Sequence, residues 1–127
     1  MESDKKPPVF LDLLLIHKPV SALLSIGHRI SGALLFLSIP FLIYLLDLSL
    51  QSSAGFEQVA AILDGWFAKM IGFVVIWCVT HHLLSGIRFL LLDIEVGIER
   101  DHALASARAV FIAGAVLTFI FSAVILF

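Results

Sequence analysis

The chain has 127 residues, of which 61% are hydrophobic and 14% charged, and its formal net charge is -2 at pH 7. A mean hydropathy of +1.09 excludes an ordinary soluble domain, because a fold of this size buries only part of its apolar surface. The net charge disfavours nucleic-acid binding, which requires a basic stripe. The single cysteine, Cys78, excludes an intrachain disulfide, and the absence of C-x-x-C-H excludes covalent c-type haem attachment by the usual motif.

The first part of the chain, "MESDKKPPVFLDLLLIHKP", does not predict a signal peptide. Its apolar core over residues 9–16 is short, is interrupted by Asp12 and lacks a small-residue cleavage site. It is also unlike the Arg-rich, Ser-rich and acid-poor leader of an imported organelle protein. We therefore expect residues 1–20 to be a cytoplasmic or interfacial lead-in, and the bacterial inner (cytoplasmic) membrane to be the location.

Three segments are long and apolar enough to cross a bilayer, which takes about 20 residues. They cover about residues 30–50, 66–92 and 107–127. The sequence predicts an all-α integral membrane protein with three transmembrane helices, which form a single membrane-anchor domain over residues 1–127. Pro40 is expected to bend the first span, and the connection "QSSAGFEQVAAILDG" is expected to contain a short surface helix.

The distribution of lysine and arginine predicts the direction of the spans. No basic residue lies between Arg29 and Lys69, and none follows Arg108. Basic residues instead precede the first span and flank the second connection: Lys5, Lys6, Lys18, Arg29, Arg88, Arg100 and Arg108. Because cytoplasmic connections carry the excess of Lys and Arg, we expect a cytoplasmic N-terminus and a periplasmic C-terminus.

The first span opens with a polar stretch, "KPVSALLSIGHRISGALL", in which Pro19 suits a first helical turn. Helical spacing places four residues on one stripe, with Arg29 at its edge: Ser21, Ser25, His28 and Gly32. This stripe is either a polar helix end with Arg29 paired to lipid phosphate, or a pocket for a haem propionate or a quinone carbonyl. Arginine and serine donate hydrogen bonds to such oxygens, and the residues alone leave both interpretations open.

The second span ends in "THHLLSGIRFLLLD", and ionisable groups within a span usually face a bundle interior or a cavity. Helical spacing places the residues of this segment on two adjacent stripes. One stripe contains His82, Gly86, Phe89 and Asp93, and the other contains His81, Ser85, Arg88 and Leu92. The histidines either hydrogen-bond to neighbouring helices or include a metal or haem ligand. Adjacent residues point about 100° apart, so the two cannot both ligate one iron. Gly86 is expected to leave a flat surface for a porphyrin, and Arg88 to snorkel to the membrane edge.

Two motifs resemble the cytochrome b556 subunit family of succinate dehydrogenase, a membrane anchor of respiratory complex II. They are "SIGHRISG" over residues 25–32 and "HLLSGIRFLLLD" over residues 82–93. The resemblance implies that His82 is an axial, metal-binding ligand of one haem b shared with a second anchor subunit. It places His28 and Arg29 near the haem propionates, and Ser25 and Arg29 at ubiquinone.

Three positions depart from the family pattern. The lead-in has "KPP" over residues 6–8 where many members have Arg-Pro, so no fixed role follows for a basic residue there. Phe89 stands where many members have histidine, so no ligand role follows for it. His81 replaces a residue that is often aromatic and is a competitor for the iron. The spacing to Gly86 and Arg88 favours His82.

The resemblance implies a membrane-anchor subunit that holds an iron–sulfur subunit and a flavoprotein subunit, so that electrons from succinate reach ubiquinone. This chain has too few cysteines for clusters and no dinucleotide fingerprint. It is therefore expected to be a non-flavin subunit of succinate:quinone oxidoreductase, without catalysis of its own.

Three alternatives compete with this interpretation. One is a haem-free anchor of a related fumarate reductase, which an absorbance spectrum would distinguish. Another is a small proton-coupled transporter that uses His81, His82 and Arg88 as a relay, although the sequence shows no internal repeat. The third is a di-iron oxygenase, for which five histidines over three segments are too few.

Overall fold

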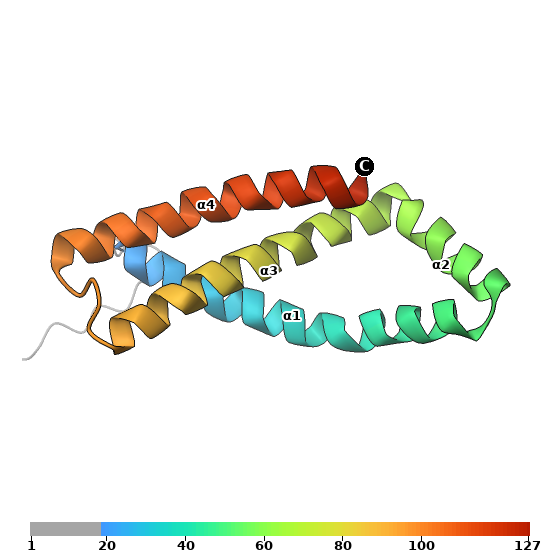
Figure 1. The fold of residues 1–127 in the computed structure, drawn as a ribbon, viewed down its shortest axis with the longest axis horizontal. Helices are drawn as coiled ribbons and strands as arrows, with labels where there is room; N and C mark the ends of the chain where they lie inside the picture. Colours follow the sequence, from blue (N-terminus) through green and yellow to red (C-terminus); the bar gives the residue numbers. More distant parts are fainter. Residues whose placement is uncertain (1–18) are drawn as a thin grey trace, which may run out of the picture.

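The computed structural model describes residues 19–127, which form four helices (Figure 1). They are α1 (Val20–Gln51), α2 (Ser53–Asp64), α3 (Trp66–Asp93) and α4 (Arg100–Leu126). Within this part of the chain no strand occurs, so the prediction of an all-α fold is confirmed. Most of the predicted lead-in, with its three lysines, lies outside the described residues.

Three of the helices are long and apolar enough to cross a membrane. The most apolar windows of α1, α3 and α4 have mean hydropathies of 2.2, 1.7 and 2.6. The three predicted spans are confirmed, but α1 and α4 begin earlier than their apolar segments do. At the start of α1, Pro19 has extended backbone angles (φ -63°, ψ 151°), and its carbonyl accepts hydrogen bonds from the amides of Ala22 and Leu23. The helix therefore starts directly after the residue that has no N–H of its own.

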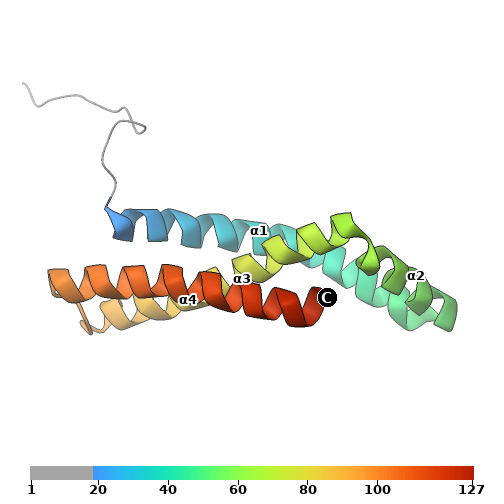
Figure 2. The same cartoon turned by 90° about the horizontal axis from the view of Figure 1, so that it is seen from above.

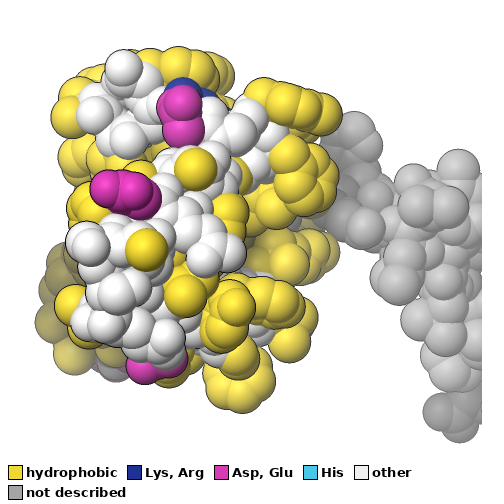
Figure 3. Space-filling model, turned by 90° about the vertical axis from the view of Figure 1, so that its right-hand side faces the viewer, with side chains coloured by type: hydrophobic (Ala, Val, Ile, Leu, Met, Phe, Trp, Pro, Cys, Tyr) yellow, Lys and Arg dark blue, Asp and Glu magenta, His cyan; other side chains and the backbone are white. Residues whose placement is uncertain are grey.

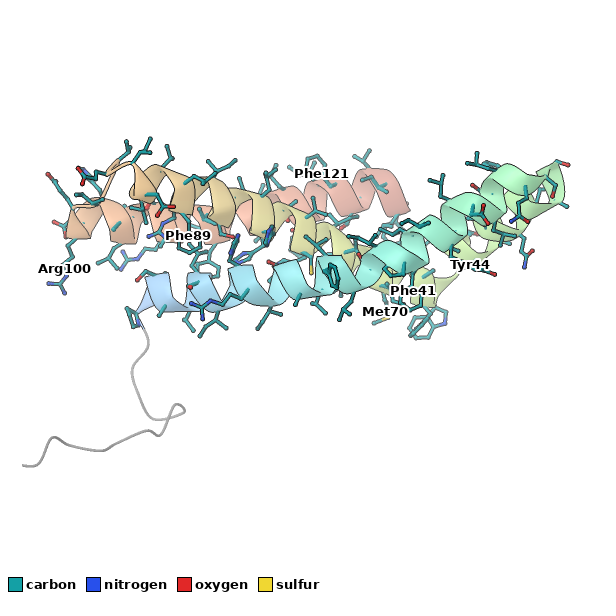
Figure 4. All side chains as sticks on the ribbon, turned by 90° about the horizontal axis from the view of Figure 1, so that it is seen from below. Phe41, Tyr44, Met70, Phe89, Arg100 and Phe121 are labelled. Carbon is teal, nitrogen blue, oxygen red and sulfur yellow. The ribbon has the colours of Figure 1, made fainter. Side chains whose placement is uncertain are left out.

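The helix α1 continues through Pro40 and bends there. Figure 4 shows that the helix axis changes direction close to Phe41. The C-terminal half of α1 consequently diverges from α3 (Figure 1) and packs against α2 instead. The predicted short helix in the connection is thus confirmed as α2, which starts where the Ser52 hydroxyl accepts a hydrogen bond from the amide of Gly55 at 3.0 Å.

The helix α3 lies between α1 and α4 and contacts both (Figure 1), and Figure 2 shows α4 running beside the N-terminal half of α1. The contacts are made largely by small and polar side chains, and the hydroxyls of Thr80 and Thr118 lie 2.7 Å apart between α3 and α4. Small residues allow close approach of membrane helices, whose association gains little from hydrophobic burial. The large apolar side chains point outward, as at Phe36 and Phe41, which are both 72% exposed.

The two ends of the helix bundle differ in charge. The start of α1, the end of α3 and the start of α4 lie at one end (Figures 1 and 2), which carries most of the arginines. The other end, at α2, shows acidic side chains and little basic surface (Figure 3). Lys69 lies near that end and pairs with Asp64 at 2.8 Å, which holds the pKa of this carboxyl below its usual range. The end with the arginines also carries Asp93, Glu95, Glu99 and Asp101, so the two ends differ in arginine content and not in the presence of acidic residues.

Candidate functional site

Packing of α1 against α3 brings together His28 and His82, which belong to the two separate sequence motifs. Their imidazole rings are stacked, with centroids 4.1 Å apart and an interplanar angle of 7°. The ring of Phe89 lies edge-on to His28 at 5.3 Å. Two residues that the family resemblance assigns to one site are therefore in direct contact.

The hydrogen bonds of His82 determine where its ring proton lies. Its Nδ1 is 3.0 Å from the carbonyl oxygen of His28 and 3.4 Å from the hydroxyl of Ser31. A carbonyl oxygen only accepts, so Nδ1 carries the proton and Nε2 of the neutral ring keeps its lone pair. Within the described residues, Nε2 of His82 makes no hydrogen bond. It also does not belong to the buried side-chain atoms that lack a partner, so it is not enclosed by protein. This donor set fits an iron ligand, because metal-bound histidines usually donate their other N–H to a carbonyl or a carboxylate.

His81 lies in a different environment from His82. It is 2% exposed, with its ring stacked on Trp77 at 5.2 Å and tilted against Phe111 at 5.6 Å. Its Nε2 is enclosed without a hydrogen-bond partner and faces Gly27, where a Cβ would lie 2.6 Å away. Because protein surrounds this nitrogen, His81 is a packing residue between three helices. The geometry favours His82 as the residue that can bind a ligand.

The surface expected over Gly86 is not bare in this structure. The Nε2 atom of His28 lies 3.4 Å from the position that a Cβ on Gly86 would take. The flat porphyrin surface expected there stays a prediction. The imidazole of His28 lies next to Gly86, at a distance that an added Cβ would meet as an ordinary contact.

Ser25 and Arg29 lie one turn apart on α1, beside His28. Ser25 is half-buried and Arg29 is exposed. No hydrogen bond or ion pair joins Arg29 to another residue in the described part of the chain. Both side chains therefore remain available to one small ligand next to the paired histidines.

Sequence reasoning assigned no role to Ser31 and did not recognise why Gly32 is needed. Ser31 is completely buried, and its hydroxyl donates to the carbonyl of His28 at 3.0 Å. A Cβ on Gly32 would lie 2.8 Å from Cε1 of His82. Both residues belong to the first motif and follow His28 by about one helical turn. This spacing is the sequence feature that could have indicated their role.

Arg88 does not snorkel to the membrane edge, which corrects the expectation. It is 5% exposed, and its Nε and Nη2 donate to the Ser106 hydroxyl at 3.0 Å and the Ala103 carbonyl at 2.9 Å. The first turns of α4 supply acceptors within reach, so the guanidinium is satisfied inside the protein. Arg88 therefore joins the end of α3 to the start of α4.

We expect Arg88→Ala to lower the free energy of unfolding by about 2–3 kcal/mol, because hydrogen bonds to a charged group contribute about this much. Unfolding by a denaturing detergent, followed by circular dichroism, measures the change. The matched control is Arg108→Ala, which removes an exposed arginine from α4. Equal stabilities of the two variants would contradict a structural role for Arg88.

Comparison with known proteins places the chain in a family. The model of a family described as succinate dehydrogenase/fumarate reductase transmembrane subunit matches residues 3–121. A succinate dehydrogenase cytochrome b556 subunit of Coxiella burnetii (strain RSA 493 / Nine Mile phase I) is 38% identical over 109 residues, covering 84% of this chain and 86% of the relative. A subunit of the same name from Paracoccus denitrificans is 28% identical over 120 residues, covering 94% and 92%. The chain, a membrane protein with three apolar helices, therefore belongs to the succinate dehydrogenase/fumarate reductase transmembrane subunit family.

Proposed function

We propose that this chain is the cytochrome b subunit that anchors a succinate dehydrogenase in the bacterial inner membrane. The observation that carries the proposal is the Nδ1–H of His82, which is held by a backbone carbonyl and leaves Nε2 available. The names of the relatives, which include cytochrome b556, support a haem ligand. Haem b, when bound, would supply a one-electron redox centre within the membrane, and His82 would bind its iron.

The remaining haem contacts divide between this chain and a partner. His28 stacks on His82, and Arg29 follows His28 in α1, so both are suited to hold the propionates. Nε2 of His81 is enclosed in the core, so this residue would not supply a second ligand to the iron. We assign the second ligand to a second small membrane-anchor subunit, which shares a single haem with this chain.

The quinone site is assigned to Ser25 and Arg29. These side chains would donate hydrogen bonds to a carbonyl oxygen of ubiquinone at the start of α1. The charge of Arg29 stabilises the negative charge that develops on this oxygen as the quinone is reduced. Electrons would arrive through an iron–sulfur subunit, which receives them from a flavoprotein subunit that oxidises succinate.

Two other functions receive less support. A haem-free fumarate reductase anchor is compatible with the family description, which covers both enzymes. The proton-relay transporter is disfavoured because Nε2 of His81 has no partner and the guanidinium of Arg88 bonds to α4. These groups do not form a continuous relay.

An absorbance spectrum of the complex, purified from its native membrane, tests the proposed function. We expect a reduced-minus-oxidised difference spectrum of low-spin haem b in amounts equal to those of this chain. A complex that oxidises succinate with quinone but shows no haem would instead identify the haem-free anchor. A chain that purifies without any succinate-oxidising activity would contradict both.

The direction of the chain in the membrane is part of the same proposal. We expect the end of the bundle that carries the arginines to face the cytoplasm and Phe127 to lie on the periplasmic side. A reporter that is active only in the cytoplasm, fused after Phe127, should be silent, and the same reporter at the N-terminus should be active. The opposite pattern would move Ser25 and Arg29 to the periplasmic side, away from a cytoplasmic iron–sulfur subunit.

A further inference from the structure

We propose that Gly32, Ser31 and the backbone carbonyl of His28 form a slot in α1 that sets the orientation and tautomer of His82. Gly32 is then a positioning residue, because it acts on the haem through His82 and does not touch the iron. This inference rests on the proposed function, since it concerns a ligand of the haem.

The slot exists because Gly32 has no side chain. A Cβ at this position would lie 2.8 Å from Cε1 and 3.2 Å from Nδ1 of His82. Both atoms belong to a rigid aromatic ring, so the contact is not relieved by rotation of a flexible side-chain end. The stacked ring of His28, whose centroid lies 4.1 Å from that of His82, also limits the movement of the imidazole. Any side chain at residue 32 would therefore displace Nδ1 from the His28 carbonyl.

Ser31 completes the slot with a consistent pattern of donors and acceptors. Its hydroxyl donates to the same carbonyl of His28 at 3.0 Å, so its lone pairs can face Nδ1 of His82 at 3.4 Å. Both oxygens accept from Nδ1–H, and only the Nδ1-protonated ring satisfies this arrangement. Because Ser31 is completely buried, water does not compete for these bonds. The structure thus assigns the free lone pair to Nε2 before any ligand binds.

The slot has a measurable effect on the haem. A ligating imidazole that donates its second N–H to a carbonyl is a stronger base. Stronger electron donation favours the oxidised over the reduced iron. Loss of the hydrogen bond should therefore raise the midpoint potential of the haem and change the orientation of the ring.

The decisive variant is Gly32→Ala in the assembled complex, with Gly114→Ala as its matched control. Gly114 also lies inside a spanning helix, but the nearest atom to its added Cβ is Leu84 Cδ1 at 4.0 Å, which is an ordinary contact. We expect Gly32→Ala to shift the equilibrium toward reduced haem on the order of tenfold, which is 59 mV for one electron. A redox titration gives this shift, and electron paramagnetic resonance of the oxidised haem reports the changed ring orientation. Gly114→Ala should leave both unchanged.

A second variant keeps the inference testable if Gly32→Ala does not assemble. Ser31→Ala removes the hydroxyl without adding volume, and its control is Ser38→Ala, because Ser38 makes the same type of bond to the Leu35 carbonyl at 2.7 Å, farther along α1. We expect Ser31→Ala to alter the resonance spectrum and Ser38→Ala to leave it as in the wild type. A wild-type spectrum for Ser31→Ala would overturn the inference in that case.

The same measurements on His82→Ala separate this inference from the proposed function. If His82→Ala loses the haem while Gly32→Ala and Ser31→Ala retain wild-type potential and resonance, the ligand is right and the slot is wrong. If His82→Ala keeps a wild-type haem signal, the ligand assignment fails and the slot fails with it.

Discussion

His82→Ala is expected to remove or severely alter the low-spin haem b spectrum of the assembled complex. The variant lacks the imidazole whose Nε2 remains available while Nδ1 is held by the His28 carbonyl. An alanine offers no donor atom to iron, and no other histidine in the described part of the chain has this arrangement. Absorbance spectra and haem content per complex measure the effect, and we expect a nearly complete loss.

The neighbouring variant His81→Ala is the control for this experiment. His81 is enclosed by Trp77, Phe111 and Gly27, so its removal should weaken packing and leave the haem spectrum largely preserved. Loss of the spectrum in His81→Ala and its retention in His82→Ala would reassign the ligand. Full haem content in this chain expressed alone would contradict a second ligand from a partner subunit.

Arg29→Ala is expected to lower succinate–quinone turnover by about 10- to 100-fold, because a hydrogen bond from a charged donor contributes about 1.5–3 kcal/mol. Ser25→Ala should reduce turnover about fivefold, since a neutral hydrogen bond contributes about 1 kcal/mol. Arg29→Lys retains the charge but loses the planar pair of donors, so we expect an intermediate activity. The exposed Arg108 on α4, as Arg108→Ala, is the matched control and should retain wild-type turnover.

Two assays on the same preparation distinguish a quinone site from an assembly defect. One measures succinate oxidation with quinone, and the other uses an artificial dye that bypasses the membrane site. A fall in the first assay alone supports the role of Ser25 and Arg29. If neither activity changes in an assembled complex, the pocket assignment is wrong. If both fall together, the polar stripe on α1 serves docking of the other subunits.

Several features of this protein were determined by the sequence alone. Apolar segments of sufficient length predict three spanning helices, because a backbone in lipid must satisfy its own hydrogen bonds. Pro40 predicts the bend in α1, and the connection before Trp66 predicts the short helix α2, and both are present. The helical period also predicts that His81 and His82 face different surroundings, because adjacent residues differ by about 100° around the axis. These properties depend on residues close together in the chain.

The contacts between side chains of different helices could not be predicted from the sequence and were decided by the tertiary structure. Neither motif by itself reveals that His28 stacks on His82, that Gly32 makes room for the ring, or that Ser31 shares a carbonyl with it. The same limit explains the error at Arg88, because its acceptors belong to α4 and lie well apart from it in sequence. Helical periodicity specifies the face on which a side chain lies, but not which helix covers that face or at what height. The helix that covers a face, and its position along the axis, are set by how closely small residues allow α1 and α4 to approach α3. This approach depends on all three helices together.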